Sequence, residues 1–272
     1  IPASLVKLRQ LLVLRLGYNE LTGAIPAELG DLDRLQRLDL NRNMLEGEIP
    51  ISLCNLASLQ ELYVHDNQLT GRIPAEISRL SELSMVSLGR NRLHGRLPAE
   101  LFTLPRLRIL GLYDNEFSVS LSPAVGNLVN LTHLSMYENQ FEGELPDELY
   151  TLANLRHLKL SNNHFSGEIS SAIGELGHLT HLWLDENDFS GSLPDELAGM
   201  DSLAVIDVNG NRFTHFPDIS SFSSLRTLQL QNNCLTFGDV EPNMSVASDF
   251  YGYAPQDSLG SKRDTTLTAG RP

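Results

Sequence analysis

An asparagine recurs every 24 residues along this chain, and this constant spacing constrains the fold more than any other feature. Nine asparagines keep the spacing, and a tenth follows after a gap of 22 residues. A fixed period of this size predicts a repeat architecture, in which units stack because a single unit cannot bury its own apolar side chains. The ten positions are Asn19, Asn43, Asn67, Asn91, Asn115, Asn139, Asn163, Asn187, Asn211 and Asn233.

Each repeat follows one apolar pattern, LxxLxLxxNxLxGxIPxxLxxLxx. The LxL alternation predicts a short strand, because side chains alternate between the two faces of a strand. The IPxxLxxL stretch has helix-like spacing and predicts a short helical segment on the return path. The asparagine follows the strand, where a buried amide can bond the backbone of its own and adjacent turns.

A second apolar position lies two residues after each asparagine. Leucine occupies it in the first four repeats and phenylalanine in the next five. We interpret the phenylalanines as a stack of core rings rather than as a ligand groove. They are Phe117, Phe141, Phe165, Phe189 and Phe213.

The repeat pattern over residues 1–235, in ten LxxLxLxxN segments, resembles the leucine-rich repeat family. It is similar to the 24-residue type with the LxGxIP segment, best known from plant receptor ectodomains. The resemblance implies an α/β fold, a right-handed solenoid with a parallel β-sheet on the concave face and short helical or 3-10 segments on the convex face. It also implies recognition of partners on the concave face rather than catalysis.

Two parts are expected, a solenoid over residues 1–235 and a C-terminal cap and linker over 236–272. The solenoid is expected to be N-terminally truncated, because its first two residues align with Ile25 and Pro26, halfway through a repeat. The last part is rich in Pro, Ser, Gly and Asp, which favours loops. It is similar to the segment after the repeats in some bacterial surface leucine-rich repeat proteins, so residues 265–272 could open a downstream β domain.

Charge and motifs narrow the classes of function. The net charge is -14, and residues 137–272 hold 7 Lys and Arg against 20 Asp and Glu, a balance of -13. Such acidity disfavours nucleic acid, whose phosphates need a basic surface, and suits a cationic partner or solubility. No apolar run is long enough to cross a membrane. Phosphate-loop, zinc-protease and nucleophile-elbow motifs are missing, so neither enzymatic activity nor a cofactor is predicted.

The binding residues are expected at outward positions of the concave strands. The notable side chains gather in repeats five to eight, with an outlying pair in repeat three. Exposed aromatic side chains dominate many interfaces, so this surface is the predicted partner site; the alternative is incidental strand-favouring residues. The predicted partner-binding residues are Tyr63, His65, Tyr113, His133, Tyr137, His157, Lys159, His181, Trp183 and Asp185.

Several secondary hypotheses remain open. The row His133, His157 and His181 could bind partners in a protonation-dependent way, becoming cationic in mild acid. A metal site is not predicted, because three ligands in a straight row cannot surround one ion tetrahedrally. The sequons at Asn130 and Asn243 are glycosylation sites only if the protein is eukaryotic and secreted.

The predicted function is non-enzymatic recognition of a protein or peptide ligand, in a larger surface or secreted protein at an extracellular or cell-surface location. One alternative is a glycan-binding adhesion module in which Trp183, Tyr137 and Tyr113 stack on sugar rings. Another is a cytoplasmic regulatory repeat region of a kinase or GTPase, and a third is a structural spacer. Two irregular repeats, around Val119 and around His215, are expected to change the local curvature.

Overall fold

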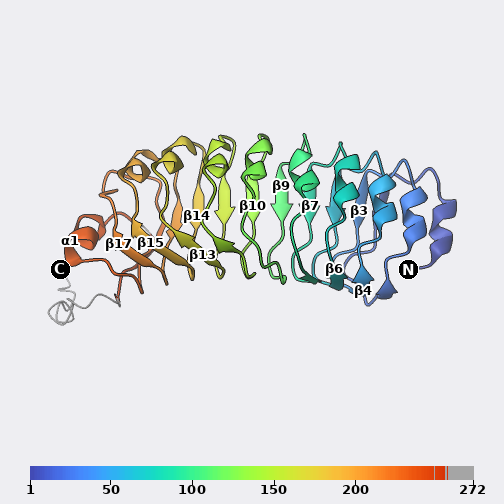
Figure 1. The fold of residues 1–272 in the computed structure, drawn as a ribbon, viewed down its shortest axis with the longest axis horizontal. Coiled ribbons are helices and arrows are strands. Elements are labelled where there is room, and N and C mark those ends of the chain that lie inside the picture. The colour runs from blue at the N-terminus through green and yellow to red at the C-terminus, as the bar shows by residue number, and fades with distance from the viewer. Residues whose placement is uncertain (248, 255, 257–272) are drawn as a thin grey trace.

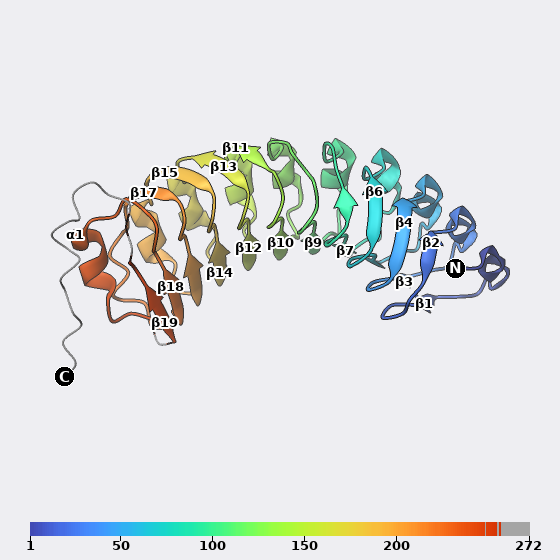
Figure 2. The same ribbon diagram turned by 90° about the horizontal axis from the view of Figure 1, so that it is seen from below.

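The computed structural model describes residues 1–247, 249–254 and 256, and these form a stack of coils (Figure 1) that is bent into an arc (Figure 2). The N-terminal coil and the short helix α1 (Phe237–Val240) lie at opposite ends of the stack. Each repeat makes one coil, numbered here from the first strand, and each coil contacts mainly its neighbours. The α/β solenoid expected from the repeat pattern is confirmed.

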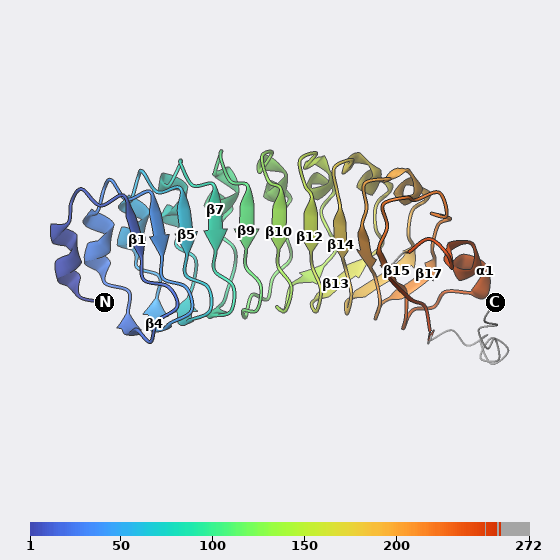
Figure 3. The ribbon, with the colours of Figure 1, turned by 180° about the vertical axis from the view of Figure 1, so that it is seen from behind.

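A parallel sheet of eleven strands, called the inner sheet, lines the inside of the arc (Figure 2). Figure 3 shows its strands side by side along the stack. Equivalent residues of neighbouring repeats pair in register, as Leu134 does with Leu110 and Leu158. The strands are β1 (Val13–Arg15), β3 (Arg37–Asp39), β5 (Glu61–Tyr63), β7 (Met85–Ser87), β9 (Ile109–Gly111), β10 (His133–Ser135), β12 (His157–Lys159), β14 (His181–Trp183), β16 (Val205–Asp207), β18 (Thr227–Gln229) and β19 (Phe250–Gly252).

The repeated asparagines form a ladder of buried amides beside the inner sheet. Asn163 donates from Nδ2 to the carbonyl oxygens of Leu160 at 3.0 Å and Ser161 at 3.1 Å in its own coil. It also donates to the carbonyl of Met136 at 3.0 Å and accepts from the backbone N–H of Phe141 at 3.0 Å, both in the preceding coil. The predicted backbone bonding is therefore confirmed. These bonds hold a strained turn, since nine non-glycine residues beside the ladder have φ between 50° and 59°.

The return path of most coils is a 3-10 helix on the outer side. In most coils a proline precedes the helix, and its fixed φ suits the entry, as at Pro50 with φ -62°. Ser122 and Ser170 replace this proline, and each hydroxyl instead accepts a backbone N–H of the first turn. The helices are η1 (Ala3–Lys7), η2 (Ala27–Asp31), η3 (Ile51–Asn55), η4 (Ala75–Arg79), η5 (Ala99–Thr103), η6 (Pro123–Asn127), η7 (Asp147–Thr151), η8 (Ser171–Glu175) and η9 (Asp195–Gly199).

Two further parallel sheets of four strands each, the outer sheets, follow the ladder. Seven of the repeat glycines here have φ between 72° and 83°, which side chains disfavour. Val119 stands at the equivalent place of the fifth coil, does not adopt a positive φ, and separates the two sheets. The strands are β2 (Thr22–Ala24), β4 (Met44–Glu48), β6 (Gln68–Gly71) and β8 (Arg92–Leu93), then β11 (Glu142–Gly143), β13 (His164–Gly167), β15 (Asp188–Ser192) and β17 (Arg212–His215).

The core is one continuous column of leucines and phenylalanines between the sheets and the helices. The five spine phenylalanines are fully buried, and neighbouring rings stack with centroids 5.9 to 6.2 Å apart. The interpretation of this spine as core is confirmed. The two cysteines, Cys54 and Cys234, are unpaired.

The segment after Leu235 covers the last coil. It folds into α1, the helix η10 (Glu241–Asn243) and β19, and Tyr251 and Tyr253 pack against the core. The Tyr251 hydroxyl donates to the carbonyl of Val240 at 3.1 Å. These contacts fit the expected cap, whose boundaries at 236–272 stay a prediction. The strand expected over 265–272 lies outside the described residues.

The fold disfavours glycosylation of the sequon at Asn243, which stays a prediction. The Asn243 side chain has no exposed surface. Its Nδ2 donates to the carbonyls of Pro217 and Asp239, both at 3.1 Å, and its Oδ1 accepts from the N–H of Ile219 at 2.8 Å. A three-residue motif cannot reveal that the residue caps a buried turn. Asn130, in contrast, is exposed, and its sequon stays a prediction.

Candidate functional site

All ten predicted partner-binding residues lie on the inner sheet or just beyond the ends of its strands, and each is partly exposed. Eight of them occupy four consecutive coils, as the columns of the sequence predict. The alternation within each strand places them outward because the leucines between them are buried. We call these eight the aromatic patch: Tyr113, His133, Tyr137, His157, Lys159, His181, Trp183 and Asp185.

The middle of the aromatic patch is a continuous stack of flat rings. The imidazole of His157 lies between those of His133 and His181, with centroids 4.2 and 4.3 Å away. The indole of Trp183 stacks on His181 with centroids 4.9 Å apart, and Lys159 Nζ lies 4.2 Å from the indole centroid. Each ring is held by its neighbours, so the row presents an ordered surface before any partner arrives.

Two imidazoles of the row are held by neighbouring threonine hydroxyls. Thr132 Oγ1 lies 2.9 Å from the carbonyl oxygen of Arg108 and 2.9 Å from His133 Nδ1. Thr180 Oγ1 lies 3.0 Å from the carbonyl oxygen of Arg156 and 2.8 Å from His181 Nδ1. Each threonine therefore orients its histidine through Nδ1, and Nε2 takes no part in that bond.

The surroundings of the row favour uncharged imidazoles. Burial, followed by the charge of Lys159, lowers the pKa of His133 and of His181. Burial and the two flanking histidines lower the pKa of His157 to about 4. The pKa of His157 thus falls to about 4, and the pKa values of both neighbours are lowered too, so the hypothesis of a row that is cationic in mild acid is disfavoured.

Tyr113 and Tyr137 form a second stack beyond the strand ends, with ring centroids 4.9 Å apart and planes 8° from parallel. The ring of Tyr113 lies across Gly89, where an added Cβ would come within 2.4 Å of the tyrosine Cζ. Gly89 is thus part of the site because its missing side chain makes room for the ring. The signal in the sequence is a glycine at an outward position that is followed, one repeat later, by a tyrosine at the equivalent position.

The C-terminal end of the aromatic patch is acidic. Asp185 accepts a hydrogen bond from the Ser161 hydroxyl, and burial raises the pKa of its carboxyl. Asp207, which pairs with Trp183 in the next strand, is only 6% exposed. Burial and the nearby Asp185 raise the pKa of Asp207 to about 6. Sequence reasoning missed Asp207, although its place opposite Trp183 is a signal that could have found it.

The outlying pair in the third coil, Tyr63 and His65, already contacts other side chains of the protein. The Arg37 guanidinium lies 4.5 Å from the ring centroid of Tyr63. His65 hydrogen-bonds Asn41 at 3.0 Å and Asp66 at 2.7 Å. Tyr63 and His65 therefore form a small polar cluster separate from the rings of the patch, and the structure does not bring the two groups together.

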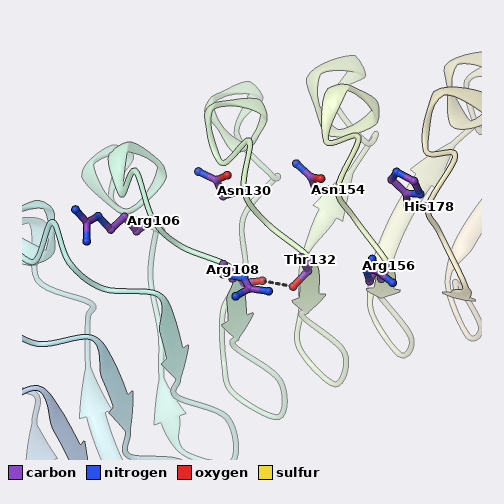
Figure 4. A pocket seen from close by; sticks show the side chains of 7 residues that line it. All are labelled: Arg106, Arg108, Asn130, Thr132, Asn154, Arg156 and His178. Carbon is purple, nitrogen blue, oxygen red and sulfur yellow. Dashed lines mark hydrogen bonds between the residues drawn. The ribbon is translucent and has the colours of Figure 1, made fainter.

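A hollow of about 450 Å³ lies along the edge where the chain enters the strands of the patch (Figure 4). Basic and amide side chains from four coils line it, and sequence reasoning singled out none of them as binding residues. We call this surface the basic edge, formed by Arg106, Arg108, Asn130, Thr132, Asn154, Arg156 and His178.

Comparison with known proteins agrees with the repeat geometry. The family described as Leucine Rich Repeat matches residues 34–56, 58–80, 130–152, 154–176 and 178–200. The solved structures similar to the chain include plant receptor ectodomains with this fold. The chain is a leucine-rich-repeat protein. A search of curated protein sequences found no match.

Three solved structures show how far the likeness of this leucine-rich-repeat chain extends. A TDR receptor structure is 36% identical with a TM-score of 0.84, over 86% of this chain and 41% of that one. The ectodomain of the Arabidopsis thaliana receptor kinase GASSHO1/SCHENGEN3, in complex with CASPARIAN STRIP INTEGRITY FACTOR 2, is 33% identical with a TM-score of 0.81, over 89% and 30%. The plant peptide hormone receptor RGFR1, in complex with RGF2, is 30% identical with a TM-score of 0.76, over 89% and 44%.

The leucine-rich-repeat chain thus spans less than half the length of each of these receptor chains. Among the described residues, no helix is long and apolar enough to cross a membrane. The same residues contain no group of three or more His, Cys, Asp or Glu arranged to hold a metal ion.

Proposed function

We propose that this leucine-rich-repeat protein is a non-enzymatic recognition module that binds a peptide or protein partner on its concave face. The observation that carries the proposal is the ordered row of His133, His157, His181 and Trp183. Structures with the same fold and at least 30% identity are described as receptors in complex with a peptide hormone or a named factor. The likeness to plant receptor ectodomains also supports an extracellular location in a larger protein.

The chemistry of the patch suits an extended peptide. Its rings are uncharged and partly exposed, so an apolar side chain can cover them without displacing a strongly hydrated charge. The Nε2 atoms of His133 and His181 take no part in the bonds to the threonines, so they can pair with polar groups of a peptide backbone. Because the rings already stack on one another, little side-chain entropy is lost on binding.

The glycan alternative is less favoured by the same contacts. Sugar rings stack on free aromatic faces, but Tyr113 and Tyr137 cover one face of each other. Trp183 has His181 stacked on it and Lys159 close to its ring. The aromatic surface that remains is arranged as a continuous row across strands, which matches an extended chain better than a single sugar ring.

A peptide library displayed on phage tests the proposal. The whole chain is used as bait, and enriched peptides are then measured against a patch variant, Tyr137→Ala with Trp183→Ala. The matched control removes two exposed apolar side chains away from the inner sheet, Ile51→Ala with Val129→Ala. We expect enriched peptides to bind the wild type and the control equally and the patch variant at least about tenfold more weakly, as for interface hot spots.

Circular dichroism and urea unfolding must first show that all variants fold. Peptides that bind the patch variant as tightly as the wild type would contradict concave-face recognition through these rings. A library that yields no enriched peptide would favour the spacer alternative. Enrichment on an array of oligosaccharides, lost on Trp183→Ala, would support the glycan alternative instead.

A further inference from the structure

The approach to the inner sheet in coils five to eight is free of carboxylates. The chain has 34 Asp and Glu residues, yet none falls within the four stretches that lead into and include these strands. The same stretches contain three arginines, one lysine and four histidines. They are residues 104–113, 128–137, 152–161 and 176–184, and the residue that follows the last stretch is Asp185 of the aromatic patch. In a chain of net charge -14, this is a strongly segregated positive surface.

The basic edge concentrates this charge around the hollow. Arg108 and Arg156 occupy equivalent positions two coils apart, on either side of Thr132 (Figure 4). Arg106 forms an ion pair with Glu82. Neither Arg108 nor Arg156 has an ion-pair partner within the part of the chain that the structure describes. Both guanidinium groups are exposed at the hollow and keep their full set of donors.

The side-chain amides of Asn130 and Asn154 are held in place by bonds to the backbone. Asn130 donates from Nδ2 to the carbonyl of Pro105 at 2.8 Å, and Asn154 donates to that of Val129 at 2.9 Å. Each Nδ2 has a second N–H in addition to this bond. The single O–H of Thr132 is used within the protein, so this side chain offers no donor to a ligand between the arginines.

The charges of the basic edge act on the aromatic patch beside it. After burial, the charges of Lys159, Arg156 and Arg108 are what lower the pKa of His133. A ligand that lies on the rings therefore has its flank in a positive field. An anionic group on that flank gains attraction to Arg108 and Arg156. No carboxylate is among the residues that line the hollow, and Glu82 beside it is paired with Arg106.

We propose that the basic edge binds the carboxylates of an acidic segment in the peptide partner, an inference that rests on the proposed function and names the partner's chemistry. Arginine binds carboxylates in a bidentate geometry. Two strand spacings place Arg108 and Arg156 about 10 Å apart. Acidic side chains on alternate residues of an extended segment lie about 7 Å apart, a span that two long arginine side chains reach.

The test uses two synthetic peptides, one of alternating Glu and Ser and one of alternating Gln and Ser, with binding followed by calorimetry at low salt. The edge variant is Arg108→Gln with Arg156→Gln. The matched control is Arg92→Gln with Arg96→Gln, two exposed arginines beside the outer sheet, which changes the net charge equally. We expect the acidic peptide to bind the wild type and the control alike and the edge variant about tenfold more weakly, while the Gln peptide binds none.

Equal loss in the edge variant and the control would overturn the proposal, because binding would then follow net charge alone. Acidic-peptide binding that is unchanged in the edge variant would overturn it too. The proposal would also be overturned if the wild type failed to bind the acidic peptide but bound a sulfated oligosaccharide, and if the edge variant lost that binding. The Tyr137→Ala, Trp183→Ala variant keeps both arginines, so its binding of library peptides tests the proposed function. Binding of the acidic peptide by the edge variant tests the present proposal, and the two can therefore fail separately.

Discussion

At the scale of single residues, the ladder asparagines hydrogen-bond each coil to the next. Replacing Asn163 by Ala leaves the buried N–H of Phe141 without a partner. It also removes one of two bonds from the carbonyls of Leu160, Ser161 and Met136. We expect Asn163→Ala to lower the free energy of unfolding by about 2–3 kcal/mol, the cost of one unsatisfied buried donor and the lost bonds. Urea unfolding followed by circular dichroism measures it.

Asn154→Ala, one coil earlier, is the matched control, since Asn154 is exposed and makes a single bond to the backbone. We expect a change below about 1 kcal/mol, as for most surface substitutions. Similar losses in both variants would mean that the ladder contributes no more than an ordinary surface amide.

Asp207 should make the protein less stable as pH rises. Its pKa is about 6 in the folded chain, above the ordinary value, so the folded state favours the protonated acid. That advantage is present below about pH 4 and is lost as pH rises through 6. We expect Asp207→Asn to stabilise the protein by about 1–2 kcal/mol at pH 7 and not at pH 4, measured by urea unfolding at both pH values.

Asp188→Asn serves as the comparison, because Asp188 is more exposed than Asp207 and already pairs with Arg212. A gain for Asp207→Asn that is the same at pH 4 and pH 7 would show that ionisation of this carboxyl is not the cause.

Outward-facing residues such as His157 and Trp183 could be assigned from the sequence, because strand alternation fixes which face a side chain occupies. Their mutual contacts could not. The stacking of rings, the bond between His133 and Thr132, and the space at Gly89 depend on rotamers and on atoms from neighbouring coils. The basic edge was missed for the same reason, since Arg108 and Arg156 are 48 residues apart and become neighbours only when coils stack.

At the scale of elements, the sequence predicted strands and helical segments well where leucines dictate the pattern. The outer sheets were not foreseen, because they arise where a glycine with positive φ lets the chain pair with the next coil. Gly143 allows this and Val119 does not. The irregularity at Val119 was noticed in the sequence, but the interruption of a sheet could not be inferred without knowing that the sheet exists.

The histidine row crosses three neighbouring strands, and Lys159 is the charge that lowers the pKa values of its two outer members most. Burial lowers the pKa values of His133 and His181 first, and Lys159 lowers them further. We expect Lys159→Gln to raise both pKa values while leaving them below the ordinary value of about 6.5. Titration of the imidazole Cε1 protons by NMR measures each one.

Arg212→Gln is the control for that titration, as it removes a cation that pairs with Asp188 outside the row. Unchanged histidine pKa values in Lys159→Gln would show that burial alone keeps the row neutral. A larger rise in the Arg212 variant would assign the effect to net charge.

At the scale of the whole molecule, stability passes from coil to coil because contacts join mainly neighbours. A chain that ends at residue 235 lacks α1 and β19, so the leucines of the last coil become exposed. We expect faster amide hydrogen exchange in β18 and β16 of this truncated chain, with exchange in β10 unchanged. Mass spectrometry of exchanged peptides measures the gradient.

A chain that ends at residue 256 keeps α1 and β19 and is the control. Unchanged exchange in β18 after truncation at 235 would show that the following segment does not protect the last coil. Faster exchange along the whole stack would show that the coils unfold as one cooperative unit instead.

The interruption at Val119 has a mechanical consequence. Among the described residues, outer-sheet pairing reaches the fifth coil from the first group of coils through one isolated bridge, between His94 and Glu116. We therefore expect the arc to bend more easily at this coil than where the outer sheets are continuous. The stacked rings of Tyr113 and Tyr137 join this coil to the next, so a ligand that holds both rings should stiffen the arc where the outer sheets are interrupted.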